Sequence, residues 1–91
     1  MRSFRGAVVV VTGAASGLGR AFVEILRAQG ARVAALDVDR AGLDRLAAEL
    51  GGDGPDALVL PCDVTDRAAC ESAVARAAAR FGRIDVLIAN A

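Results

Sequence analysis

The residues best suited to hold a ligand are three glycines in the stretch TGAASGLG, residues 12–19. Gly13, Gly17 and Gly19 follow an apolar run and precede an amphipathic segment, so the pattern predicts a strand that turns into a helix. Helix N-termini carry free N–H groups and a partial positive charge, and they attract phosphate. Glycines let a diphosphate approach because no Cβ blocks it, and the hydroxyl of Ser16 adds a donor. A tight turn without a ligand is the alternative, because a glycine pattern alone is a weak signal.

The glycine spacing differs from two common phosphate motifs. It is not G-x-G-x-x-G, because Phe22 stands where the last glycine would fall. It is not a P-loop either, because the sequence contains no Lys that could reach a phosphate.

Asp37 narrows the choice of ligand. It ends the next apolar segment, where a carboxylate can accept hydrogen bonds from both ribose hydroxyls of an adenosine. A carboxylate there repels a 2′-phosphate, so NAD is predicted and NADP is less favoured. Arg40 is the contrary observation, because a nearby Arg can accept a 2′-phosphate. Asp37 could instead cap a helix, but Asp39 is better placed for that role.

Groups for catalysis or metal binding are scarce. The sequence has no His, Tyr, Trp or Lys, and Cys62 and Cys70 do not form a CxxC pair. No metal site is predicted, and Cys70 is interpreted as a core residue. Asp, Glu and Cys are the acid–base groups that remain at neutral pH. No catalytic residue is predicted among them.

The composition limits the classes of protein. The chain has 91 residues, 55% of them hydrophobic, with a mean hydropathy of +0.45, which excludes a disordered chain. Net charge is zero and the Arg residues are scattered, which argues against a nucleic-acid partner. No apolar stretch reaches membrane-spanning length. Two free thiols suit a reducing cytoplasm, which is the predicted location.

Strand and helix patterns alternate along the whole chain, which predicts an α/β fold with a parallel sheet and right-handed crossovers. Strands are expected at residues 7–12, 32–37, 57–64 and 83–89, the third ending near Pro61, and helices at 17–29, 39–50 and 66–80. Asp39 is expected to cap the second helix, and Thr65 or Asp66 the third. Each helix is expected to turn one apolar face toward the sheet. These faces are Leu18, Ala21, Phe22, Ile25 and Leu26 in the first helix, Leu43, Leu46, Ala47 and Leu50 in the second, and Cys70, Ala73, Val74, Ala77 and Phe81 in the third.

The glycine turn with Asp37, CDVTD at residues 62–66, and FGRIDVLIANA at residues 81–91 together resemble the short-chain dehydrogenase/reductase family. The resemblance covers the chain in order and spacing. It implies a Rossmann-like doubly wound parallel sheet, truncated to four strands in the order 3-2-1-4, with residues 1–91 as the incomplete N-terminal part of a dinucleotide-binding domain. The helices at 17–29 and 39–50 are then expected on one face of the sheet. The helix at 66–80 lies alone on the other face, leaving an exposed apolar patch and an open edge strand.

The resemblance also implies the residues of a cofactor site. The pyrophosphate and the adjoining ribose would be held by Gly13, Ser16, Gly17, Leu18 and Gly19. Asp37 would select NAD, and Asp63 and Val64 would contact the adenine. Asn90 would stabilise the sheet beside the cofactor, with Ala89 replacing the family's usual preceding Asn. Asp63 as a strand-end residue and Asn90 as a purely structural residue are the alternatives.

Family members catalyse with a Ser and with the Tyr and Lys of Y-x3-K, and this chain has neither Tyr nor Lys. The favoured hypothesis is therefore the N-terminal fragment of a dehydrogenase that binds NAD for hydride transfer to or from an alcohol or ketone, its catalytic half absent. A substrate is expected only with that missing half, and a homo-oligomer only for the intact family. A non-catalytic dinucleotide-binding remnant, or a docking partner of a complementary chain, is the alternative. A methyltransferase-like domain is more distant. The isolated chain is expected to be poorly soluble or molten.

Overall fold

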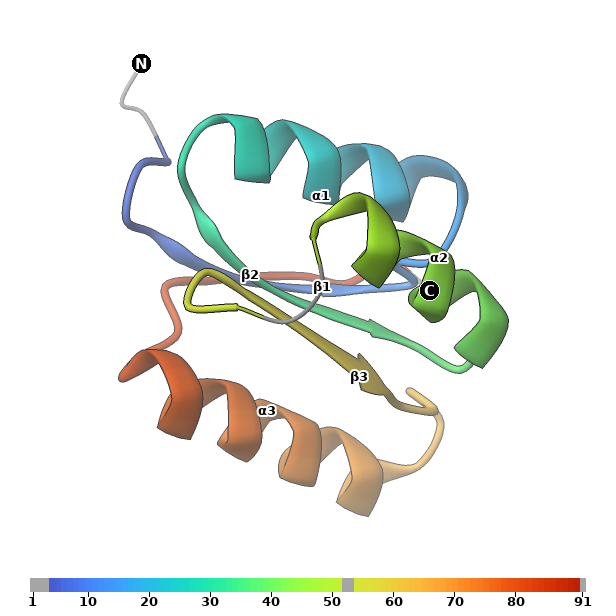
Figure 1. Ribbon diagram of the computed structural model, residues 1–91. Helices are drawn as coiled ribbons and strands as arrows, with labels where there is room; N and C mark the ends of the chain where they lie inside the picture. The colour runs from blue at the N-terminus through green and yellow to red at the C-terminus, as the bar shows by residue number, and fades with distance from the viewer. Residues whose placement is uncertain (1–3, 52–53, 91) are drawn as a thin grey trace.

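The computed structural model describes residues 4–51 and 54–90, in which strands and helices alternate as predicted. The elements in chain order are β1 (Val8–Thr12), α1 (Gly17–Ala28), β2 (Arg32–Asp37), α2 (Arg40–Glu49), β3 (Ala57–Pro61), α3 (Arg67–Phe81) and β4 (Val86–Ile88). The strands form one parallel sheet in the order β3-β2-β1-β4, drawn in Figure 1. The predicted α/β class and strand order are therefore confirmed.

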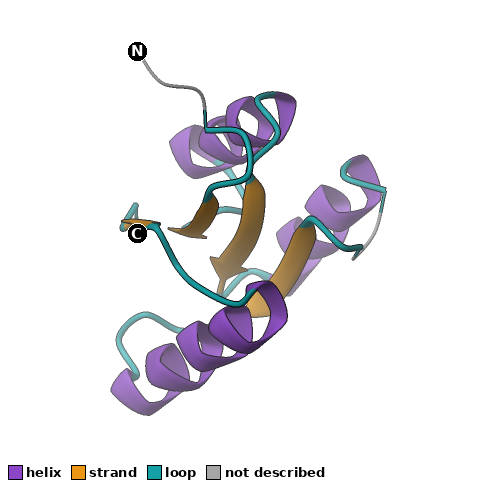
Figure 2. Cartoon of the chain, turned by 90° about the vertical axis from the view of Figure 1, so that its left-hand side faces the viewer, coloured by secondary structure: helices purple, strands orange, loops and turns teal. Residues whose placement is uncertain are grey.

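Both faces of the sheet are covered by helices, but unequally. Helices α1 and α2 lie on one face and α3 lies alone on the other, as Figures 1 and 2 show. Val9 and Val11 of β1 belong to the core under α1 and α2, and Val8 and Val10 to the core under α3. All four side chains have no exposed surface, which explains why β1 reads as an uninterrupted apolar run.

The buried face of α1 differs from the predicted one. Leu18 and Ile25 were expected inside, but they are 62% and 54% exposed, whereas Gly19, Val23 and Leu26 are buried. The reason is the close approach of Gly19 to the glycine turn, which fixes the rotation of the helix about its axis. Residues four and seven positions further along then face the sheet.

The predicted face of α3 is correct except at one position. Ala73, Ala77 and Phe81 are buried, and Cys70 packs against the same core. Val74 was also expected inside but is 37% exposed. It lies on the side of α3 that faces the open part of the sheet, where no described helix covers it.

The helix caps follow the sequence pattern. The Asp39 carboxylate accepts a hydrogen bond from the N–H of Gly42 at 3.0 Å, and Asp66 accepts one from the N–H of Ala69 at 3.1 Å. Asp66 rather than Thr65 is therefore the cap of α3. These caps set where α2 and α3 begin, and so they position the loops between each strand and its following helix.

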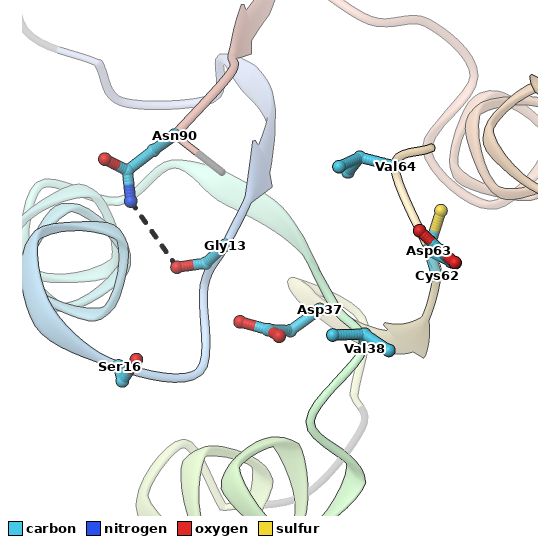
Figure 3. A pocket seen from close by; sticks show the side chains of 8 residues that line it. All are labelled: Gly13, Ser16, Asp37, Val38, Cys62, Asp63, Val64 and Asn90. Carbon is cyan, nitrogen blue, oxygen red and sulfur yellow. Dashed lines mark hydrogen bonds between the residues drawn. The ribbon is translucent and has the colours of Figure 1, made fainter. Parts of the chain in front are cut away.

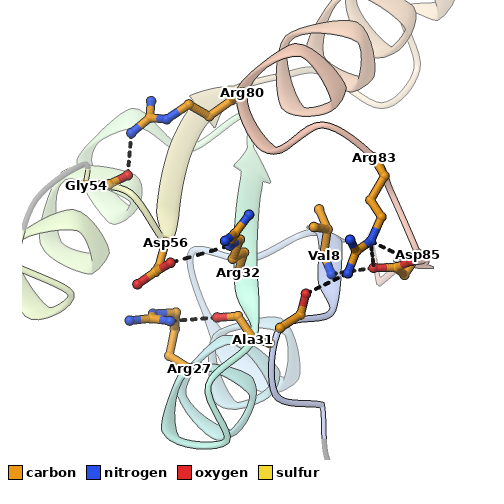
Figure 4. Close-up of polar contacts among 10 residues, drawn as sticks. Val8, Arg27, Ala31, Arg32, Gly54, Asp56, Arg80, Arg83 and Asp85 are labelled. Carbon is orange, nitrogen blue, oxygen red and sulfur yellow. Dashed lines mark hydrogen bonds and ion pairs between the residues drawn. The ribbon is translucent and has the colours of Figure 1, made fainter.

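Strand β4 is shorter than the predicted segment 83–89. Figure 4 shows the reason: the N–H of Val8 donates to the carboxylate of Asp85 at 2.8 Å instead of to a strand carbonyl. Arg83 in turn holds that carboxylate and donates to the carbonyl of Gly6 at 2.9 Å. The segment before Val86 is therefore fixed by these side-chain bonds together with one backbone bond, from the N–H of Asp85 to the carbonyl of Val8 at 2.9 Å.

Candidate functional site

A cavity of about 360 Å³ lies at the carboxyl ends of the strands, where parallel α/β sheets commonly bind ligands. Every strand contributes a loop to it, as Figure 3 shows. The lining residues are Gly13, Ser16, Asp37, Val38, Cys62, Asp63, Val64 and Asn90. Segments that are distant in the sequence are thus brought to one site by the sheet.

The cavity gathers most of the predicted site residues. Gly13, Ser16, Asp37, Asp63, Val64 and Asn90 line it. Gly17, Leu18 and Gly19 do not line the cavity and instead form the first turn of α1. The side chain of Leu18 points to solvent, so a ligand at this turn would meet backbone N–H groups, which have no intrahelical acceptor at a helix start.

Two lining residues, Val38 and Cys62, were not predicted from the sequence. Each directly flanks a predicted carboxylate, Asp37 or Asp63. Position next to a strand-end Asp was the signal that could have identified them.

The turn between β1 and α1 requires glycine for two physical reasons. Gly13 and Gly17 have φ values of +63° and +58°, in the left-handed region that favours glycine. A Cβ on Gly19 would lie 2.0 Å from the carbonyl oxygen of Gly13 and 2.7 Å from Nδ2 of Asn90. The helix start can therefore pack against the turn only without a side chain at residue 19.

Asp37 joins β2 to the glycine turn. Its Oδ2 accepts a hydrogen bond from the N–H of Ala15 at 2.9 Å, and its Oδ1 accepts one from the N–H of Asp39 at 3.0 Å. The carboxylate is thus held at the wall of the cavity, and capping of α2 falls to Asp39. Each carboxylate oxygen keeps a lone pair for a further donor such as a hydroxyl group.

Asp63 is held by the following turn. Its Oδ1 accepts hydrogen bonds from the Thr65 hydroxyl at 2.7 Å and from the Thr65 N–H at 2.9 Å. The Thr65 hydroxyl, and then its N–H, lower the pKa of the Asp63 carboxyl below its ordinary value. The group therefore stays ionised at neutral pH and can accept a hydrogen bond from an amine.

Asn90 ties the end of β4 to the same turn. Its backbone N–H donates to Oγ1 of Thr12 at 3.0 Å, and its Nδ2 donates to the carbonyl of Gly13 at 3.5 Å. The residue thus has a structural role and also lines the cavity.

Two further properties concern the described parts of the chain alone. Residues 4–51 and 54–90 contain no cluster of three His, Cys, Asp or Glu residues that could hold a metal ion. Within the same ranges, no helix is both long and apolar enough to cross a membrane.

A parallel sheet in this order, with a glycine turn after its first strand and a carboxylate after its second, defines a nucleotide-binding α/β architecture. The sequence profile of the short chain dehydrogenase family matches residues 7–91. The chain therefore belongs to that family, as the resemblance implied.

Individual relatives agree with this assignment. The D-threitol dehydrogenase of Mycolicibacterium smegmatis is 46% identical over 86 residues, which are 94% of this chain and 33% of that protein. A 3-ketoacyl-(acyl-carrier-protein) reductase of Brucella melitensis, solved with NADH, superposes with a TM-score of 0.85 at 36% identity, covering 93% of this chain and 34% of that one. A short chain dehydrogenase/reductase of Burkholderia phymatum, solved with NAD, gives a TM-score of 0.88 at 34% identity, covering 96% of this chain and 31% of that one. The chain thus spans about a third of the length of these relatives.

Proposed function

We propose that the cavity binds the adenosine diphosphate half of NAD, and that residues 1–91 act as the N-terminal, cofactor-binding part of a short-chain dehydrogenase. The observation that carries the proposal is the placement of the Asp37 carboxylate in the wall of the cavity, within hydrogen-bonding distance of the glycine turn. Relatives solved with NADH or NAD share this fold, which supports a nicotinamide dinucleotide as the ligand.

Each part of the cofactor has matching groups on the chain. The first N–H groups of α1, at Gly17, Leu18 and Gly19, can donate hydrogen bonds to the pyrophosphate. The positive end of the helix dipole attracts the same group. The Ser16 hydroxyl makes no capping hydrogen bond and can donate to the same phosphates. At the other end of the cavity, Asp63 and Val64 suit the adenine, through an accepted hydrogen bond and an apolar contact.

The choice of NAD over NADP rests on charge. Asp37 faces the cavity, and a second negative group at the ribose 2′ position would lie against it. Arg40, the residue that could compensate, begins α2 and is exposed outside the cavity lining. The arrangement therefore favours two ribose hydroxyls as ligands of Asp37.

NAD supplies the hydride-accepting nicotinamide, and this chain's residues supply binding and orientation. The sequence has no Tyr and no Lys, so a proton-transfer pair of that kind must come from outside it. An alcohol or ketone substrate, a homo-oligomer and a cytoplasmic location are proposed for the complete protein on the same basis.

The test is a binding titration of the protein with NAD, NADP and adenosine diphosphate ribose. NAD and adenosine diphosphate ribose are expected to bind with similar affinity, and NADP more weakly. Asp37→Asn should reduce the preference for NAD over NADP, whereas Glu71→Gln, which removes an exposed carboxylate on α3, should not. Tighter binding of NADP than of NAD by the unmodified protein would contradict the proposal.

The alternative of a docking partner has one observation in its favour. An apolar groove of about 290 Å³ lies between α3 and the sheet on the face that α3 covers only in part. Its lining residues are Val10, Thr12, Leu36, Val64, Cys70, Val74, Leu87 and Ala89. The intact mass of the protein made from its native gene distinguishes the dehydrogenase hypothesis from the docking-partner hypothesis. A mass well above 9.2 kDa favours a longer dehydrogenase, and a mass of 9.2 kDa favours a remnant or a docking partner.

A further inference from the structure

The two cysteines of the chain lie next to each other at the edge of the cavity. Cys62 directly follows β3, and Cys70 lies in the N-terminal part of α3. Both are free thiols, and their sulfur atoms are 3.8 Å apart, with the Cys62 thiol donating to the Cys70 sulfur. A disulfide needs an S–S distance of about 2.0 Å. Formation of a disulfide would therefore require the two sulfurs to approach each other by roughly 1.8 Å.

The segment between the cysteines is the one assigned to the adenine. The Cys70 thiol lies 3.7 Å from the carbonyl oxygen of Asp63 and 3.6 Å from that of Val64, and it can donate to either. Cys62 lines the dinucleotide cavity, and Cys70 lines the apolar groove on the other side of the segment. A covalent link between the sulfurs would therefore act directly on the loop that carries Asp63 and Val64.

We propose that Cys62 and Cys70 form a thiol-oxidation site, at which a peroxide produces a disulfide that weakens dinucleotide binding. The effect on binding rests on the proposed function, whereas formation of the disulfide does not. The site requires no metal and no additional residue, because the fold has already placed the two sulfurs in contact.

The chemistry proceeds in two steps. The Cys70 thiolate attacks one oxygen of hydrogen peroxide, so that an S–O bond forms, the O–O bond breaks, and the departing hydroxide takes up a proton to become water. The sulfur, now a sulfenic acid, has lost two electrons to the peroxide. The Cys62 sulfur then attacks the Cys70 sulfur, so that the S–S bond forms and the S–O bond breaks. The hydroxide leaves with the Cys62 proton as a second water. Two thiols and one peroxide thus give one disulfide and two waters.

The surroundings of the two sulfurs fit this order of events. Cys62 is only 5% exposed, and Cys70 is more accessible. Burial, followed by the hydrogen bond and the charge of the neighbouring Cys70, raises the pKa of the Cys62 thiol to about 11. The more accessible Cys70 is therefore the first to meet the peroxide. Cys62 remains a thiol at neutral pH and gives up its proton as it attacks the sulfenic acid.

Disulfide formation removes the thiol hydrogen that Cys70 offers to the carbonyls of Asp63 and Val64. It also draws the start of α3 toward β3. Loss or displacement of one hydrogen bond at the adenine end is expected to weaken NAD binding by about 2- to 10-fold. By linkage, bound NAD should slow disulfide formation.

The first measurement is a peptide map of the protein made from its native gene, reduced and then treated with hydrogen peroxide. Trypsin cleaves after Arg67, between the two cysteines, and yields the peptides 46–67 and 68–76. The expected result is that these peptides stay joined, with a combined mass lower by two hydrogen atoms, and separate on reduction. Separate peptides carrying added oxygen atoms, or unmodified thiols, would overturn the proposal whether or not the protein binds NAD.

The second measurement is an NAD titration of the reduced and the oxidised protein. The unmodified protein should lose affinity after peroxide and regain it after reduction. The Cys70→Ser variant keeps a donor near the two carbonyls and should bind NAD equally before and after peroxide. If the disulfide forms but affinity is unchanged, coupling to the site is refuted. If the reduced protein does not bind NAD, the proposed function fails, and the peptide map still decides the chemistry.

Discussion

The carboxylate of Asp37 and the backbone N–H of Ala15 are joined by a hydrogen bond of 2.9 Å. This bond connects the end of β2 to the turn between β1 and α1. A second bond, from the N–H of Asp39, holds the other oxygen of the same carboxylate. Asp37 is therefore both a candidate ligand of the ribose and a support of the glycine turn.

Substitution of Asp37 tests the supporting role. Asp37→Ala removes both acceptors and should lower the free energy of unfolding by about 1.5–3 kcal/mol, the range for hydrogen bonds to a charged group. Asp37→Asn keeps one acceptor and should cost less. Urea denaturation gives both values. An Asp37→Ala variant as stable as the unmodified protein would mean that the turn holds its shape without this bond.

The close packing of Gly19 yields a second prediction. Gly19→Ala places a methyl group 2.0 Å from the carbonyl oxygen of Gly13, where the backbone cannot move aside cheaply. The expected loss of stability is about 1–3 kcal/mol or more, accompanied by loss of NAD binding. Gly54→Ala is the matched control, because no atom of the described residues lies within 4 Å of its added methyl group. Equal effects of the two substitutions would show that packing at the turn is not the cause.

Most of the fold could be predicted from the sequence, because the burial of a strand or helix determines its pattern of apolar residues. The valines of β1 are buried on both faces, which produces the continuous apolar run that predicts a central parallel strand. Asp39 and Asp66 likewise occupy the positions at which short polar side chains cap helices.

The rotation of α1 could not be predicted in the same way. Leu18 and Ile25 fit an apolar helical stripe, but the contact of Gly19 with the turn decides which face is buried. That contact is between backbones and leaves no hydrophobic signal. The site shows a similar limit: Val38 and Cys62 line the cavity because of loop geometry, which their residue types do not reveal.

The contacts of the Asp85 carboxylate lead to a prediction of how the stability of the fold depends on pH. The N–H of Val8, and then the Arg83 side chain, lower the pKa of the Asp85 carboxyl below its ordinary value of 3.8. Its folded pKa is thus below its unfolded pKa. The group therefore stabilises the fold above the unfolded pKa, and this contribution is lost as the pH falls through the folded pKa.

Asp85→Asn should consequently be less stable than the unmodified protein at neutral pH, and the difference should shrink below about pH 4. Urea denaturation at several pH values between about 7 and 2 measures it. Some acid sensitivity should persist in the variant, because the pKa of Asp63 is lowered as well. A stability difference that stays constant down to the lowest pH would show that the Asp85 contacts do not depend on its charge.

The exposed apolar groove leads to a prediction about dye binding and self-association of the isolated chain. Leu87 of the edge strand β4 is 57% exposed and lies across the groove from Val74 of α3. Exposed apolar patches bind the dye ANS and promote association, and an open strand edge adds to this tendency. The 91-residue chain should therefore bind ANS and self-associate, and Leu87→Lys should reduce both.

Ile25→Lys is the matched control, since Ile25 is 54% exposed on α1, which covers the opposite face of the sheet. If Ile25→Lys reduced dye binding and association as much as Leu87→Lys, general surface hydrophobicity rather than the groove would be responsible. If only Leu87→Lys reduced dye binding and association, the groove would be the surface that a further segment or chain has to cover.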